Sequence, residues 1–171
     1  MRSALVTLLM IVSVAGAIAQ SNRSAYTSLE QKQCRTVKSA QSDYEGRCRG
    51  VAGYMLLVSE GDLRQNVTVV TPQGTKHSLD LWDVISGGFS SVGPKAEWRL
   101  AKQSPVALIV RYNASEDPAQ PNKLTSYLAV AKITATEVCV TDKISPGPTA
   151  NEDARRAADG AASKSCLKAQ N

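Results

Sequence analysis

Aromatic and arginine side chains are the residues of this sequence whose types best suit recognition of a partner. Trp98 is followed directly by Arg99, and Arg64, Trp82 and Phe89 lie elsewhere in the chain. On an exposed face of a sheet, tryptophan and arginine supply the apolar area and charged donors that dominate many binding surfaces. We therefore take Arg64, Trp98 and Arg99 as candidate binding residues.

A purely structural interpretation of the same residues competes with this one. Trp98 could belong to the core, and Arg99 could lie at the surface or pair with Glu97 or Asp62. The sequence alone leaves both interpretations open, because it does not say which face of its strand Trp98 occupies.

Residues that could support catalysis are scattered along the chain. His77 is the only histidine, so a Ser–His–Asp triad would have to use it, and the sequence has no G-x-S-x-G motif. Paired carboxylates could hydrolyse a glycosidic bond at a defined separation, which nothing in their spacing sets here. We therefore predict no catalytic residues. The carboxylates considered are Glu60, Asp62, Asp80, Asp83 and Glu97.

Motifs for metals and cofactors are missing from the sequence. It contains no H-E-x-x-H, EF-hand, P-loop or G-x-G-x-x-G pattern. We expect no cofactor and no metal site, with calcium binding by loop carboxylates left open.

The four cysteines predict two disulfides, because their number is even and the chain carries an export signal, described below. Three pairings are possible. We favour Cys34–Cys48 and Cys139–Cys166, since each pair lies within one local unit. The lack of a C-x-x-C motif and the single histidine argue against a zinc or redox site.

The N-terminus is typical of a cleaved export signal. Arg2 precedes an apolar run over 4–14, and the segment ends with Ala17-Ile18-Ala19. We predict a signal peptide over 1–19 and a single domain over 20–171, a length that suits one core. The mature protein would be periplasmic or secreted, with no stable membrane insertion after cleavage.

The charge of the chain is mildly positive. Lys and Arg number 20 against 15 Asp and Glu, and Arg2 leaves with the signal, so the mature charge is about +4. The basic residues are scattered rather than clustered beside aromatic residues, so we expect no nucleic-acid partner. A weak attraction to an anionic envelope polymer is compatible with this charge.

The pattern of apolar residues predicts an α+β domain: a curved, mostly antiparallel sheet of about seven strands with one C-terminal helix. The clearest hairpin joins 53–59 to 63–70 through a turn at 60–62, with Leu63, Val67 and Val69 on one face. Segment 77–85 is ambiguous between strand and short helix, 86–94 reads as a flexible loop, and 21–32 reads as a loose lead-in. The other predicted strands are 34–38, 96–100, 106–112, 126–133 and 138–144.

The predicted helix begins at Asn151, a favourable N-cap residue. Ala154, Ala158, Ala162 and Cys166 recur every four residues and would form one stripe of small side chains against the sheet.

Several short segments follow one another in a fixed order over nearly all of 20–171. They are Tyr26-Thr27-Ser28-Leu29 before Cys34, Cys48-Arg49-Gly50 with Gly53-Tyr54, Glu60-Gly61-Asp62-Leu63-Arg64, Val92-Gly93 with Glu97-Trp98-Arg99-Leu100, Cys139-Val140, and a helix ending near Cys166. In this order they resemble a family of small exported proteobacterial proteins with two disulfides and no assigned activity. The resemblance implies a periplasmic or secreted location and the same cysteine pairing, and it supplies no catalytic residues.

Together these observations favour an uncharacterised exported protein that is a non-enzymatic envelope binding or inhibitor-like module. Its partner would be an envelope protein or an anionic envelope polymer. One alternative is a cell-wall or ester hydrolase, which a cleft holding two carboxylates within about 10 Å would favour. The other is a lysozyme-inhibitor-like protein, although a positive charge does not steer a protein toward lysozymes, which are typically basic.

Overall fold

The structure is a computed structural model that describes residues 22–39 and 43–169. The predicted signal peptide at 1–19 lies outside these residues. Within them, one sheet has the strand order β10-β9-β8-β7-β5-β4-β3-β2, with β1 paired to β7 and β6 paired to β5. The strands are β1 (Arg23–Ser28), β2 (Arg35–Ser39), β3 (Asp43–Arg49), β4 (Met55–Gly61), β5 (Arg64–Val70), β6 (Lys76–Ser78), β7 (Ser90–Ala101), β8 (Ser104–Ser115), β9 (Leu124–Ile133) and β10 (Val138–Ile144).

Four helical segments accompany the strands within the described ranges. They are η1 (Gln31–Gln33), α1 (Leu81–Val84), α2 (Ala150–Asp159) and η2 (Ala161–Ser163), of which η1 and η2 are 3₁₀ turns.

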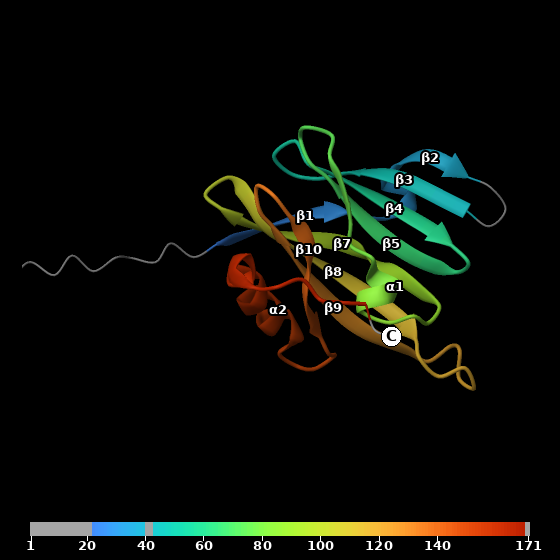
Figure 1. The fold of residues 1–171 in the computed structure, drawn as a ribbon. Coiled ribbons are helices and arrows are strands. Elements are labelled where there is room, and N and C mark those ends of the chain that lie inside the picture. The colour runs from blue at the N-terminus through green and yellow to red at the C-terminus, as the bar shows by residue number, and fades with distance from the viewer. Residues whose placement is uncertain (1–21, 40–42, 170–171) are drawn as a thin grey trace, which may run out of the picture.

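The sheet bends so that two layers face each other (Figure 1). Strands β2 to β6 form one layer, and β1 with β7 to β10 forms the other. The layers are joined where β5 and β7 run parallel, at the pair Arg64–Ser90, while the other pairings of the described strands are antiparallel. The α+β class and the mostly antiparallel sheet are confirmed.

The predicted count of about seven strands is wrong, because the described residues form ten. The strands that sequence reasoning missed are β1, β3 and β6. Each is short or rich in polar residues, so its own pattern gives little sign of a strand. Each becomes a strand through a neighbour: β1 pairs with β7, β3 lies between β2 and β4, and β6 pairs with the end of β5.

The main hydrophobic core fills the space between the two layers. Leu56, Val67 and Val69 enter it from the β4–β5 hairpin, and Trp98 and Tyr112 enter it from β7 and β8, all fully buried. Burial of this kind stabilises the fold by roughly 1.5–3 kcal/mol per large apolar side chain. The predicted β4–β5 hairpin is confirmed.

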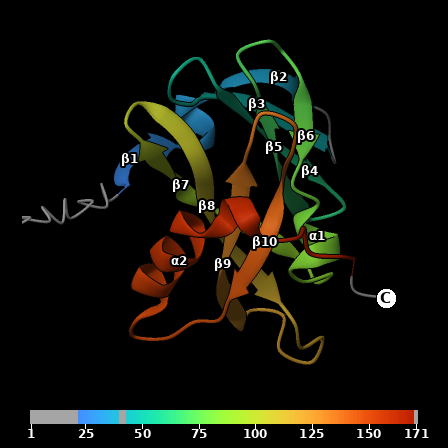
Figure 2. The same cartoon turned by 60° about the vertical axis from the view of Figure 1, so that its left-hand side comes forward.

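A second, smaller core lies on the outer face of β8 and β9, beneath α2 (Figure 2). The helix buries Ala150, Ala154 and Ala158, whose small side chains let it lie close to the sheet. The predicted stripe is wrong beyond Ala158, because the helix ends before Gly160. Neither Ala162 nor Cys166 is part of the helix, and the N-cap residue is Thr149 rather than Asn151.

Both predicted disulfides are present. Cys34–Cys48 joins the start of β2 to β3, and Cys139–Cys166 joins β10 to the C-terminal tail. The tail continues along β10, where Leu167 N donates to Val140 O at 2.7 Å. Disulfides of this kind persist in oxidising compartments. Among the described residues, no helix has the length and apolar character needed to cross a membrane.

Candidate functional site

Trp98 is a core residue. Its side chain is fully buried between the layers, and its ring lies 5.9 Å from that of Tyr54. The indole Nε1 donates to Thr27 Oγ1 at 2.9 Å, so β1 satisfies the only polar atom of the side chain. Of the two interpretations of Trp98, the core position is therefore the one that the structure shows. In this conformation Trp98 is not accessible to a partner.

Arg99 lies in a buried clamp between β1, β7 and α2. The residue is only 7% exposed. Its Nε and Nη2 donate to the two carboxylate oxygens of Asp159, both at 2.8 Å, and its Nη1 donates to Ser24 Oγ at 2.6 Å. Burial opposes ionisation of Asp159, but the bonds from Arg99 and Asn22 outweigh it and lower the pKa of this carboxyl. The ion-pair partner is thus Asp159, and Glu97 lies further away, at 4.0 Å.

Glu97 belongs to the same structural cluster. Arg155 Nε donates to it at 2.7 Å, and Ser24 Oγ donates to the same carboxylate. Burial opposes its ionisation, yet the bonds from Arg155 and Ser24 bring its pKa below the ordinary value. A carboxylate held in this way serves the packing of β1 and α2 against β7 rather than a reaction.

Arg64 is the candidate binding residue that reaches the surface. Its Nε donates to Gly87 O at 2.9 Å, and its Nη1 forms an ion pair with Asp62. Its guanidinium lies over the ring of Phe89, 5.3 Å from the ring centre, in a cation–π contact. Arg64 is therefore held in one orientation beside an exposed aromatic ring.

The turn before Arg64 exposes the side chain of Leu63, a residue whose backbone conformation is strained. Gly61 pairs with Arg64, so Asp62 and Leu63 form a two-residue turn, with φ of 50° and 57°. Such turns favour Asn-Gly, and a leucine in this conformation costs roughly 1–2 kcal/mol. Leu63 is 62% exposed. The prediction that it shares the core face of Val67 and Val69 is wrong, because the strand begins only at Arg64.

Helix α1 presents Trp82 beside this turn, with 38% of the residue exposed. The ambiguous segment 77–85 proves to be the end of β6 followed by this short helix. Its first N–H, at Leu81, donates to the buried Asn66 Oδ1 at 3.0 Å. Lys143 Nζ donates to Ile85 O at 2.6 Å, at the negative end of the helix. Both ends of α1 are thus anchored to the sheet.

Phe89 lies on a segment that is fixed rather than flexible. Its carbonyl accepts a hydrogen bond from Ser115 N at 2.8 Å, and 90–94 belongs to β7. A Cβ on Gly88 would lie 1.9 Å from Ser115 O, so only glycine allows this approach of the two backbones. The prediction of a flexible loop over 86–94 is therefore wrong for its second half.

Arg64 and Trp82 line one hollow, Phe89 lies beneath the guanidinium of Arg64, and Leu63 precedes Arg64 in the turn. We name Leu63, Arg64, Trp82 and Phe89 the hairpin patch. The hollow has a volume of about 620 Å³ and is lined by Gly61, Asp62, Arg64, Trp82, Asp83 and Gly87. The β4–β5 turn, α1 and the β8–β9 connection lie at the same end of the molecule (Figure 1). The exposed Leu124 extends this end, since it pairs with Ser115, the neighbour of Phe89.

The remaining chemical candidates do not form a catalytic group among the described residues. His77 lies on β6 opposite Val69, and Ser78 Oγ donates to Asp80 rather than to His77. Asp62 and Asp83 both line the hollow, but Asp62 is paired with Arg64 and Asp83 accepts from Trp82 Nε1 at 2.9 Å.

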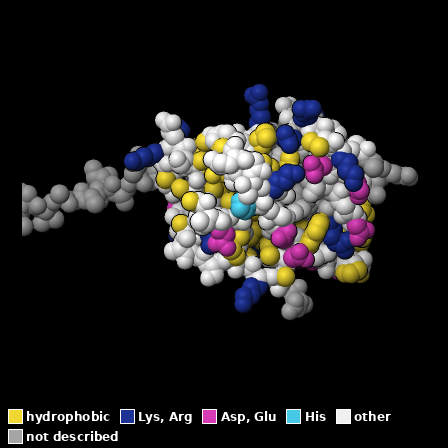
Figure 3. Space-filling model, turned by 45° about the horizontal axis from the view of Figure 1, so that its top comes forward, with side chains coloured by type: hydrophobic (Ala, Val, Ile, Leu, Met, Phe, Trp, Pro, Cys, Tyr) yellow, Lys and Arg dark blue, Asp and Glu magenta, His cyan; other side chains and the backbone are white. Residues whose placement is uncertain are grey.

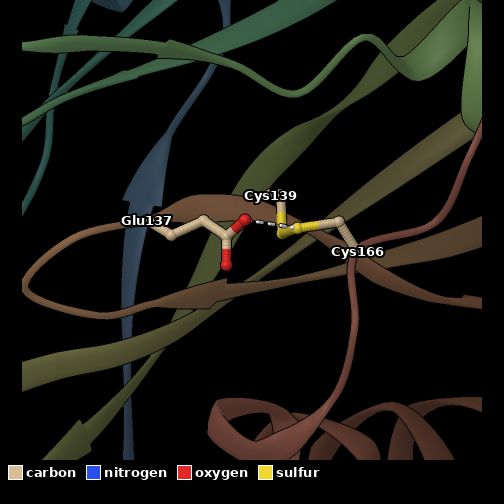
Figure 4. A group of neighbouring side chains, drawn as sticks. All are labelled: Glu137, Cys139 and Cys166. Atoms are coloured by element: carbon tan, nitrogen blue, oxygen red, sulfur yellow. Dashed lines mark hydrogen bonds between the residues drawn. A yellow bond between two sulfur atoms is a disulfide. The ribbon is translucent and has the colours of Figure 1, made fainter.

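One cluster has the composition of a metal site. Glu137, Cys139 and Cys166 place their ligand atoms within 4.8 Å of one another (Figure 4). The two sulfurs form a disulfide and therefore carry no thiolate, the form that binds metals. Glu137 is instead held by Lys132, with Nζ 2.6 Å from Oε2. The cluster fastens the C-terminal tail.

A larger open groove, of about 1070 Å³, lies between η1, β2 and the start of β7. Tyr44 on β3 lines it, and its hydroxyl is buried without a hydrogen-bond partner among the described residues. Burial raises the pKa of this phenol. Three carboxylates also line the groove, and each has a partner: Glu30 pairs with Lys32, Asp43 pairs with Lys38, and Glu60 accepts from Gln65 Nε2 at 2.7 Å.

No protein family, curated protein or solved structure matches the chain at a significant level. The resemblance to small exported proteobacterial proteins therefore stays a prediction. Sequence reasoning named Arg64 but missed Leu63. The signal that could have found it is the E-G-D-L-R turn, in which a leucine stands where a two-residue turn favours glycine.

Proposed function

We propose that this protein is a non-enzymatic binding module of an oxidising extracytoplasmic compartment, and that it binds a protein partner through the hairpin patch. The observation that carries the proposal is that the fixed guanidinium of Arg64 lies over the exposed Phe89 and lines one hollow with Trp82, beside a turn that exposes Leu63. Aromatic residues and arginine are enriched at the energetic centres of protein interfaces.

The supporting elements favour binding by a preformed surface. Asn66 and Lys143 anchor α1, Gly88 packs against β8, and Leu63 O accepts from Ser90 N at 2.9 Å. A surface fixed before binding loses little conformational entropy when the partner arrives. The hollow of about 620 Å³ beside the patch has room for side chains of the partner.

The proposal is tested by affinity capture with the oxidised protein. The immobilised chain is exposed to an envelope extract at low and moderate salt, and the retained proteins are identified by mass spectrometry. We compare the wild type with Leu63→Ala/Trp82→Ala and with Gln103→Ala, which changes an exposed residue in the turn between β7 and β8, outside the patch.

The expected result is one salt-resistant protein that the wild type and Gln103→Ala retain and the double variant loses. Loss of one hot-spot side chain of about 2 kcal/mol lowers affinity roughly 30-fold. Retention of the same protein by all three variants would contradict the proposed surface, and retention of nothing would contradict the proposed function.

A cell-wall or ester hydrolase is the second candidate, because Asp62 and Asp83 line the same hollow. It requires turnover of a peptidoglycan or ester substrate by the purified protein, and loss of that turnover in Asp62→Asn or Asp83→Asn. The lysozyme-inhibitor-like alternative requires inhibition in a lysozyme assay that Leu63→Ala/Trp82→Ala abolishes.

A further inference from the structure

Three arginines lie on the outer face of β2 and β3, away from the hairpin patch. Arg47 and Arg49 are exposed, and they alternate with the buried Gly46 and Cys48. Arg35 on β2 is directly opposite Arg47 in the register of the two strands, and it is also exposed. Residues directly opposite in an antiparallel pair share a face, so Arg35 and Arg47 project to the same side.

None of these arginines forms an ion pair with a carboxylate of the described residues. Two acidic residues share this face of β3, and both lie toward Lys38: Asp43 is bound to it with 2.8 Å between Nζ and Oδ2, and Glu45 is opposite it in the register of the strands. The residues outside the described ranges contain no Asp or Glu. The positive charge of Arg35, Arg47 and Arg49 is therefore unbalanced by any acidic side chain bound to them.

Like charges directly opposite each other destabilise a strand pair, so this arrangement is unfavourable unless an anion joins it. The Cys34–Cys48 disulfide holds it in place, because Cys34 precedes Arg35 and Cys48 lies between the other two arginines. A hollow of about 220 Å³ lies between the strands and is lined by Arg35, Thr36, Val37 and Arg47.

The positive charge continues across the same face. In the register of the strands, Arg49 is followed by Met55, Val70 and Lys76. Arg47 is followed by Leu57, Thr68 and Ser78, so these two rows contain no acidic residue. Figure 3, in which the top of the Figure 1 view comes forward, shows several Lys and Arg side chains in the upper half of the view, with acidic side chains beside them at the right and further ones below.

We propose that Arg35 and Arg47 bind a phosphate group of an anionic polymer, which then passes Arg49 and runs across the sheet toward Lys76. The planar guanidinium matches the oxygen atoms of phosphate with paired hydrogen bonds, which makes arginine the preferred residue for this group. A polymer is favoured over a lipid bilayer, because few apolar side chains of this face could insert into one. Leu57 and Val70 are buried and Met55 is partly buried, which leaves Val37 as the exposed apolar side chain at the hollow.

The test measures binding of fluorescently labelled inorganic polyphosphate to the oxidised protein over a series of salt concentrations. The test variant is Arg35→Gln/Arg47→Gln. The control is Lys102→Gln/Lys123→Gln, which removes the same charge from two exposed lysines without ion pairs among the described residues. Vesicles of phosphatidylglycerol and a carboxylate polymer, polygalacturonate, replace polyphosphate in two further arms.

We expect the arginine variant to bind polyphosphate at least about tenfold more weakly, and its salt dependence to fall by about one unit of slope per lost phosphate contact. The lysine control should stay close to the wild type. Polyphosphate should also raise the melting temperature of the wild type but not that of the arginine variant. This measurement shows whether the polymer binds the folded protein.

Three results would overturn the proposal. Equal weakening in the lysine control would mean that net charge alone attracts the polymer. Tighter binding to polygalacturonate would mean that the site does not select phosphate, and binding to vesicles without binding to polyphosphate would assign the face to a membrane. Because the hairpin patch is unchanged in all these variants, capture of a protein partner through it is unaffected by each outcome.

Discussion

Replacing Leu63 by glycine should give a more stable protein than replacing it by alanine, which reverses the usual order of these two residues. Both changes remove a side chain that is largely exposed, so they lose almost the same contacts. They differ in the backbone: φ at this position is 57°, a conformation that alanine resists as leucine does and that glycine adopts freely.

The size of the difference follows from two opposing effects. Relief of the left-handed conformation favours glycine by roughly 1–2 kcal/mol. The greater freedom of glycine in the unfolded chain favours alanine by about 0.4–1 kcal/mol. The balance is about 0.8 kcal/mol in favour of Leu63→Gly, which corresponds to about 2–3 °C in melting temperature for a chain of this length.

Urea and thermal unfolding of the two variants measure this difference. The control is the same pair of changes at Val37, an exposed residue of β2 that does not have a positive φ. There the alanine variant should be the more stable one. Both variants of Leu63 should bind the captured partner equally weakly, because each lacks the leucine side chain.

If Leu63→Ala were at least as stable as Leu63→Gly, the strained turn would not exist in solution and the reasoning would be refuted. If the expected order is found while Leu63→Gly fails to bind, the protein keeps a costly leucine at this turn for recognition. That result would connect the strain to function.

Three further predictions concern the framework of the fold. The pKa of Glu97 is lowered in the folded protein, so the stability that this group contributes is present above the ordinary carboxyl pKa and is lost as the pH falls through the lowered value. Glu97→Gln should flatten the acid side of a plot of unfolding free energy against pH, and an unchanged slope would argue against the role given to this carboxylate. Replacing Cys139 and Cys166 together by serine opens a link across a separation of 27 residues. It should lower the unfolding free energy by about 3.5 kcal/mol in urea titrations, and a loss below about 1 kcal/mol would contradict the anchoring role of the tail. Gly88→Ala would drive its Cβ into the backbone of β8, and we expect a loss of about 1–3 kcal/mol together with weaker partner capture; wild-type stability would show that the two backbones are not in close contact.

The strands that could be predicted are those whose own side chains alternate or form apolar runs. The hairpin of β4 and β5 is one example, and β8, β9 and β10 are others. The cysteine pairing was also predictable, because each pair is local in the sequence. In these cases the position of the strand, or the cysteine pair, follows from residues close together in the sequence, and the tertiary structure agrees with it.

What could not be predicted depends on distant partners. The polar segment Arg23–Ser28 becomes β1 because it pairs with β7, and it in turn supplies Thr27 as the acceptor that lets Trp98 be buried. Arg99 is paired with Asp159, which lies 60 residues away in the sequence. The residues around each of them give no indication of this pairing. The candidate site was only partly predictable for the same reason, since the packing of α1 brings Trp82 to the same hollow as Arg64.

The clamp around Arg99 also sets the order in which the chain can complete its fold. Arg99 joins the first described strand to a helix near the other end of the sequence, and Asn22 itself bonds to Asp159 across 137 residues. Contacts between such distant segments form slowly, and they cannot form before the last helix has been synthesised. Until that helix is present, β1 can pair with β7, but the contact of Asn22 with Asp159 is missing. The contacts of this clamp therefore belong to the last stage of folding, when β1, β7 and α2 are all available.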